Sequence, residues 1–189
     1  MGQKQDIREQ ILDAMVSGDQ RAFQRFYDFY FTTVYRFTRY FISCGEDCDE
    51  VVSEVFCLVW ENRLLFRNVK NLESYLYIVC RNEAYHFLKQ KAKIPNISID
   101  DMPVELSIQS ATIEGEMIEQ EMLDTYRKAV EELPERCKLI FLMVREEKLK
   151  HKEIAQILGI TEGTIEQQMN IAIKKILAVV RKHYPSLRL

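Results

Sequence analysis

The first third of the sequence carries a long run of apolar residues with the repeat of an α-helix. They recur every three or four positions, as one buried helical face requires: Phe23, Phe26, Tyr27, Tyr30, Val34, Phe37 and Phe41. Asp19 follows Gly18 and is the expected N-cap, so the pattern predicts a helix from about Asp19 to Ile42. Strand-like alternation nowhere extends beyond a few residues of the sequence. The expected fold class is therefore all-α.

Two more helices are expected in the first half of the chain. Gly45 ends the first run, and the second helix should extend from about Glu46 to Asn62, with valines inward and carboxylates outward. An irregular stretch over residues 63–71 follows. The third helix is then expected from about Leu72 to Lys91. Together they predict a small bundle whose core is rich in aromatic side chains.

Charge is distributed unevenly along the sequence. Residues 1–93 carry 13 basic and 13 acidic side chains, residues 94–126 carry eight acidic and no basic ones, and residues 127–189 carry 13 basic and eight acidic. The chain is thus neutral, then acidic, then basic. Such an asymmetry suggests three segments with different partners.

A linker is expected between two domains. Residues 94–113 contain Pro95 and Pro103 and lack sustained periodicity, which is typical of an extended, flexible segment. We therefore predict two small helical domains, over 1–93 and 114–189, joined by an acidic linker over 94–113.

Composition and motifs argue against several classes of protein. The five cysteines have no paired or zinc-ligand spacing, which predicts buried free thiols in a reducing compartment and no metal site. The polar segment Met1–Glu9 is unlike a signal peptide, and no apolar run approaches about 18 residues. We expect a cytoplasmic protein without direct membrane insertion. The sequence has no nucleophile–base pair or phosphate-binding loop, so we expect no enzyme, small-molecule substrate or cofactor.

The stretch from His151 to Ile176 has the spacing of a helix-turn-helix. Ala155 is small enough for the second helix to cross closely over the first, and Gly159 suits the left-handed backbone of the turn. Thr161 is the expected N-cap of the second helix. Four aliphatic residues are expected to lock the two helices together: Ile154, Leu158, Ile160 and Ile165. An ordinary helical hairpin is the alternative, so the flanking sequence has to decide.

The flanking sequence resembles a known family. Leu133-Pro134-Glu135-Arg136 opens an apolar helix, and the run from Leu133 to Lys182 is similar to region 4 of the sigma-70 family of RNA polymerase sigma factors. Three segments of the first half resemble region 2 in order and spacing: Gly18–Phe31, Gly45–Arg63 and Leu72–Gln90. The sequence shows neither an extra N-terminal region nor a separate region 3. It is therefore similar to the extracytoplasmic-function (ECF) group, in the style common in Bacteroidetes.

The resemblance implies a transcription initiation factor with no catalytic residues. The first domain would bind the −10 promoter element, and the second would read the −35 element and contact the β flap of core RNA polymerase. Polar, cationic and aromatic side chains suit unpaired bases. The −10 candidates lie in the loop after the second helix and on the third helix: Arg63, Phe66, Arg67, Asn68, Lys70, Arg81, Asn82, Tyr85, His86 and Lys89. Trp60 and Tyr77 fall on apolar faces and are expected in the core.

The acidic residues have implied roles as well. The second helix would present its carboxylates to the clamp helices of the polymerase β′ subunit: Asp47, Asp49, Glu50 and Glu54. In the linker, Asp100, Asp101 and Glu105 would mimic RNA phosphates. An ordinary solvated surface is the alternative in both places. The resemblance also implies an anti-sigma factor as a probable partner.

The helix-turn-helix has few cations for a promoter reader. Its candidate DNA contacts are Lys150, His151, Thr161, Thr164, Gln167, Gln168, Lys174 and Lys175. The glutamines can pair with adenine, and Thr164 can reach a thymine methyl group or a phosphate. Phosphate contacts supply much of the affinity for DNA. We therefore expect weak promoter binding by the free protein, with affinity arising only in the polymerase holoenzyme.

Two other functions remain open at this point. A stand-alone helix-turn-helix regulator, independent of core polymerase, would be expected to dimerise on a palindromic site. An adaptor would use its helix-turn-helix to bind protein. Transcription with purified core polymerase separates both from a sigma factor.

Overall fold

A computed structural model describes three ranges of the 189-residue chain: 10–69, 71–92 and 117–185. The chain divides into two compact units, Met1–Asn96 and Ile97–Leu189, and each is described by itself. Every regular element within the described ranges is helical, so the predicted all-α class is confirmed. The linker predicted over 94–113 lies outside the described residues, and the predicted domain boundaries stay predictions.

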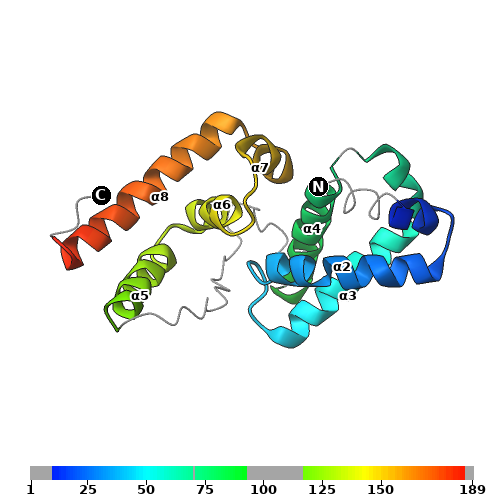
Figure 1. Cartoon of the computed structure of the whole chain (residues 1–189), viewed down its shortest axis with the longest axis horizontal. Coiled ribbons are helices and arrows are strands. Elements are labelled where there is room, and N and C mark those ends of the chain that lie inside the picture. The colour runs from blue at the N-terminus through cyan, green and yellow to red at the C-terminus, as the bar shows by residue number, and fades with distance from the viewer. Residues whose placement is uncertain (1–9, 70, 93–116, 186–189) are drawn as a thin grey trace. The chain divides into compact units, whose positions relative to one another are not determined.

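The first unit is a bundle of three long helices (Figure 1). Residues 10–16 form a short helical segment ahead of them. The elements that follow are α2 (Gln20–Thr38), α3 (Gly45–Glu61), the short 3-10 helix η1 (Arg63–Asn68) and α4 (Leu72–Ala92). The ends of α3 and α4 agree with the predicted ones to within one residue. Asp19 caps α2 as predicted, because its carboxylate accepts a hydrogen bond from the backbone N–H of Arg21 at 2.8 Å.

The prediction for the C-terminus of α2 was wrong. The helix ends at Thr38 and not near Ile42. The Arg39 side chain donates hydrogen bonds to the backbone carbonyls of Ile42, at 3.1 Å, and of Ser43, and so holds the chain in a turn. Residues 40–42 are nevertheless buried. Their apolar side chains continued the helical repeat in the sequence, although the backbone had already left the helix.

Aromatic side chains fill the core of the first unit. The ring of Phe37 is fully buried and lies 4.5 Å from that of Tyr77 and 5.7 Å from that of Tyr40, between centroids. Tyr77 is therefore in the core, as expected. Trp60 is half-buried against Phe23, with 4.9 Å between the ring centroids. Such pairs add stability beyond the area they bury.

The second unit packs its longest helix against three shorter ones (Figure 1). Its elements are α5 (Met117–Glu131), α6 (Glu135–Arg145), α7 (His151–Leu158) and α8 (Glu162–His183). Pro134 is the N-cap of α6 and not its first helical residue, one position away from the prediction. The core is aliphatic, with Ile140, Leu142 and Met143 fully buried.

The cysteines are all free, but the prediction that they are buried was wrong for two of them. Cys48, Cys80 and Cys137 are buried, whereas Cys44 and Cys57 are exposed. Both exposed thiols come from positions next to apolar residues of α3, where the sequence alone does not separate the two faces. None of the described helices is both long and apolar enough to cross a membrane.

Candidate nucleic-acid interface

The turn between α7 and α8 has the backbone that the motif predicted. Gly159 adopts φ 68° and ψ 33°, the left-handed conformation that disfavours a Cβ atom. The backbone N–H of Ile160 donates to the carbonyl of Ala155 at 3.0 Å, which closes the end of α7. Thr161 caps α8, and its side-chain oxygen accepts a hydrogen bond from the backbone N–H of Thr164 at 3.2 Å. These three features fix where α8 begins and how it leaves α7.

The contact between α7 and α8 uses a slightly different set of residues from the predicted one. Ile154 and Ile165 are fully buried, as predicted, and so is Ile157, which was not predicted. Leu158 and Ile160 are only half-buried. Leu158 is the last residue of α7, where the chain turns towards α8 and its side chain is partly open to solvent.

One face of α8 is directed to solvent along most of its length. Gln167, Asn170 and Lys174 are exposed, and their spacing of three and four residues puts them on the same face. This face is opposite the buried side that carries Ile165 and Met169. Asn170 was not predicted. Its position three residues after Gln167 is the signal that could have found it.

Three other candidates on this helix are less open than Gln167. The hydroxyl of Thr164 lies 2.9 Å from that of Thr161, so both serve the N-terminus of α8. Gln168 is half-buried, and its backbone carbonyl accepts a hydrogen bond from the Cys137 thiol at 3.2 Å. Lys175 is exposed.

Two candidates lie at the start of α7. Lys150 is exposed, and its backbone N–H donates to the Glu153 carboxylate at 2.8 Å, which stabilises the first turn. His151 is the first residue of α7 and is half-buried.

In the first unit, η1 carries candidates with unequal exposure. Arg67 is exposed. Phe66, in contrast, is 7% exposed, and its ring centroid lies 5.3 Å from that of Tyr75 and 6.2 Å from that of Phe26. It therefore packs in the core and presents no open ring face to a base. The side chain of Asn68 and the whole of Lys70 lie outside the described residues.

Arg63 and the candidates on α4 are partly buried. The Arg63 guanidinium lies 4.6 Å from the centre of the Trp60 ring and donates a hydrogen bond to the Trp60 carbonyl at 3.0 Å. On α4, the Arg81 guanidinium donates to the side-chain oxygen of Asn82 at 2.7 Å and 3.2 Å. Burial lowers the pKa of Arg81 from its usual value. Tyr85 is half-buried, and its ring centroid lies 6.0 Å from that of His86.

The polar face of α4 turns to solvent near its C-terminal end. His86 and Lys89 are exposed there. Together with the Arg81–Asn82 pair, they make the outer side of α4 basic and rich in hydrogen-bond donors.

The acidic face of α3 divides into exposed and engaged carboxylates. Asp49, Glu50 and Glu54 are exposed, as predicted. Asp47 has only 22% of its side chain exposed and pairs with Lys91 at the end of α4. This ion pair joins two helices of the bundle, so Asp47 has a partner within the fold.

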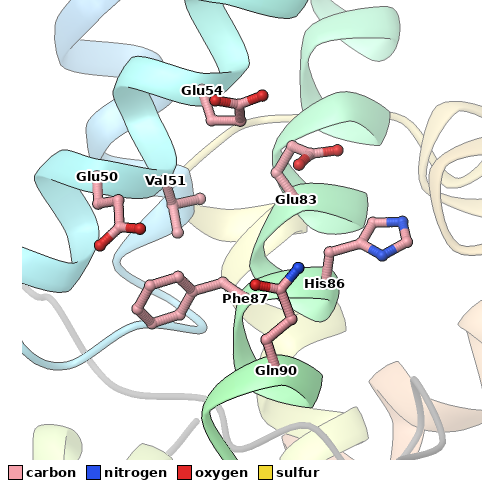
Figure 2. A pocket seen from close by; sticks show the side chains of 7 residues that line it. All are labelled: Glu50, Val51, Glu54, Glu83, His86, Phe87 and Gln90. Atoms are coloured by element: carbon pink, nitrogen blue, oxygen red, sulfur yellow. The ribbon is translucent and has the colours of Figure 1, made fainter.

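A groove of about 230 Å³ lies between α3 and α4 (Figure 2). Carboxylates from both helices border it, because Glu83 of α4 lines it together with Glu50 and Glu54 of α3. Figure 2 shows Val51 and Phe87 between the two helices, where they form the apolar part of the lining. Glu83 was not predicted, since its position beside α3 follows from how the two helices align and not from its place in the sequence.

The described residues contain no group of three His, Cys, Asp or Glu side chains that could hold a metal ion. The chemistry of these surfaces is therefore that of side-chain and backbone hydrogen bonds, charge and apolar contact.

Comparisons with known proteins agree with this division into two kinds of surface. Residues 26–94 match the family described as sigma-70 region 2, and residues 123–176 match sigma-70, region 4. The chain is 27% identical over 141 residues to RNA polymerase sigma factor SigV of Bacillus subtilis (strain 168), which covers 74% of this chain and 80% of that protein.

Two solved structures share the fold at 16% identity. CnrH, in complex with the cytosolic domain of CnrY, gives a TM-score of 0.63 over 94% of this chain and 99% of that one. The sigma factor RpoE of Bartonella quintana, in complex with the anti-sigma factor NepR, gives a TM-score of 0.60 over 84% and 96%. These relatives do not test the predicted likeness to Bacteroidetes proteins. Together, the two regional matches cover most of the chain, in the order that the sequence predicted, and the chain belongs to the sigma-70 family of RNA polymerase sigma factors, in its ECF group.

Proposed function

We propose that this chain docks on core RNA polymerase and directs it to promoters by recognising −10 and −35 elements. The observation that carries this proposal is the presence of both region 2 and region 4 in one chain. A stand-alone regulator would need only the helix-turn-helix and a means to dimerise. Because it has to reach the polymerase, we also propose that the protein acts in the cytoplasm.

For the −35 element, we assign direct readout to the exposed face of α8. Gln167 and Asn170 carry amide groups that can bond an adenine edge in the major groove, and Lys174 can contact a phosphate. Further contacts from the predicted set are assigned to the backbone of the DNA: Lys150, His151, Thr161, Thr164, Gln168 and Lys175.

For the −10 element, we assign the basic outer side of α4 together with η1. The proposed contacts are Arg63, Arg67, Asn68, Lys70, Arg81, Asn82, Tyr85 and Lys89. Phe66 is left out, because its burial supports a role as an anchor of η1. Cationic and polar side chains of this kind hold an unpaired strand without needing duplex geometry.

For polymerase docking, we assign the acidic border of the α3–α4 groove. Asp49, Glu50 and Glu54 are open to a basic partner surface, and Glu83 adds a fourth carboxylate from α4. The proposed partner is the clamp-helix region of the β′ subunit. Asp47 is left out because it already pairs with Lys91. We assign contact with the β flap to the second unit.

An anti-sigma factor is the proposed regulator. The solved RpoE structure contains an anti-sigma factor, which supports such a partner for a chain of the same fold. Co-purification from the native host tests this. Recovery of only free or core-bound protein would count against it.

The central experiment is run-off transcription with purified core polymerase on a broad set of promoter fragments. We expect initiation at specific sites only when this chain is added. The triple variant Gln167→Ala, Asn170→Ala, Lys174→Ala should lose use of promoters that depend on a −35 element. Lys182→Ala, which removes an exposed lysine in the last turn of the same helix, should retain it.

Two outcomes would contradict the proposal. Inactivity on every fragment would remove the sigma-factor role. Nanomolar, sequence-specific binding by the free protein at physiological salt, in a gel-shift titration, would instead favour the stand-alone regulator.

A further inference from the structure

Two consecutive leucines project from the first unit into solvent. Leu64 is 59% exposed and Leu65 is 53% exposed, and both belong to η1. Single exposed apolar residues are common on protein surfaces. A pair of large aliphatic side chains at the tip of one short helix is less usual and indicates a surface that becomes covered in a complex.

The tip is firmly held on both sides. Before the leucines, Arg63 packs on the Trp60 ring at 4.6 Å and bonds its carbonyl. After them, Phe66 is buried in the aromatic core. The backbone N–H of Leu65 also donates to the carbonyl of Asn62 at 2.9 Å. The leucines are therefore presented outward by a fixed backbone.

The charge around the tip identifies the kind of partner. Residues 62–71 contain three cations, Arg63, Arg67 and Lys70, and no acidic residue. The nearest carboxylates in sequence, Glu61 and Glu73, lie outside this stretch. An apolar tip between cations matches DNA, because the cations can contact phosphates while the aliphatic groups cover the face of a base.

We propose that Leu64 and Leu65 form an apolar wedge that packs against the outermost base pair of the −10 duplex and stabilises the opened strand beyond it. This rests on the proposed function, since it assumes that the chain opens promoters as part of a holoenzyme. Aliphatic wedges of this type unstack a base step, and the contact they make with the exposed base face offsets part of the unstacking cost. No base-specific hydrogen bond is involved, so the wedge acts on opening and not on sequence choice.

The test compares two templates. A promoter found by run-off transcription is prepared as an intact duplex and with its −10 segment opened in advance by mismatches. Holoenzyme is formed with the full chain, and opening is followed by 2-aminopurine fluorescence in the non-template strand. The double variant Leu64→Ser, Leu65→Ser is expected to slow opening of the intact duplex about tenfold or more, the loss expected for one large aliphatic contact. On the opened template it should match the unmodified protein.

The matched control is Phe29→Ser, which changes another large exposed side chain of the same unit, 51% exposed on α2. It should leave opening unchanged on both templates. An equal loss of the double variant on both templates would overturn the wedge and indicate that the leucines bind polymerase. No loss on either template would overturn it as well. If the unmodified chain supports no transcription on either template, the proposed function itself fails, which is a distinct result.

Discussion

The two units hold their DNA-facing elements by different physical means. In the second unit, the start of α8 is set by backbone geometry, through the left-handed Gly159 and the cap made by Thr161. In the first unit, η1 is set by side-chain packing, through the burial of Phe66 and the stacking of Arg63 on Trp60. The first arrangement depends on one turn with few neighbours, whereas the second depends on the whole aromatic core.

This difference predicts that core substitutions in the first unit have the larger effect. Phe66→Ala should lower the free energy of unfolding of that unit by about 3 kcal/mol, the low end for a buried phenylalanine. It should also release η1, so that opening of the −10 element is impaired. Urea denaturation followed by Trp60 fluorescence measures the change, because Trp60 is the single tryptophan and lies beside this element.

The matched control for Phe66 is Phe29→Ala. Phe29 has 51% of its surface exposed, so its removal should leave unfolding nearly unchanged. Similar losses for the two variants would mean that η1 is not anchored by the aromatic core, and the contrast between the units would fail.

In the second unit, a smaller change at one backbone position should be sufficient. Gly159→Ala places a Cβ atom on a residue with φ 68° and should cost roughly 1–2 kcal/mol. Nothing lies within 4 Å of that Cβ, so the cost comes from the backbone alone. Loss of helical circular dichroism on heating measures it. Transcription from −35-dependent promoters should fall with it.

Gly163→Ala is the control within the same motif. Gly163 lies inside α8, and a Cβ there would meet only the Thr161 side-chain oxygen at 3.9 Å. Alanine is also the better helix former, so this variant should be slightly more stable than the unmodified chain. If both glycine variants behaved alike, the turn would not depend on a left-handed residue.

The same distinction explains which parts of the structure the sequence could predict. Gly159, Thr161 and Asp19 act through local backbone geometry, so their roles follow from residue type and spacing. The end of α2 does not, because Arg39 stops the helix through its side chain while the apolar repeat continues through residues 40–42. Helix identity was thus predictable, and one helix end was not.

The site was predictable as a set of faces but not residue by residue. The solvent face of α8 and the acidic face of α3 follow from helical spacing. The engagement of Asp47 by Lys91, 44 positions away, depends on how α3 and α4 pack. The burial of Phe66 and the exposure of Leu64 depend on how η1 is anchored. These are long-range facts that no local pattern contains.

The smallest expected effect concerns the buried thiols, which are concentrated in the first unit. Burial raises the pKa of Cys48 to about 11 and that of Cys80 to about 12, from 9.0. Below pH 9 these thiols are protonated in both the folded and unfolded chain and do not affect stability. Between pH 9 and about pH 12 the unfolded chain loses protons that the folded chain keeps, so stability should fall as pH rises.

At pH 9.5 the expected loss is about 0.8 kcal/mol for each of these thiols, measured by Trp60 fluorescence in urea. Cys80→Ala should reduce the dependence of unfolding on pH, while Cys57→Ala, at an exposed position, should leave it unchanged. Only the slope with pH matters here, because Cys80→Ala also removes packed atoms and lowers stability at every pH. If the slope is the same in both variants, the thiol of Cys80 ionises freely in the folded protein. The core of the first unit would then be open to water, and its aromatic packing could not hold η1 in place.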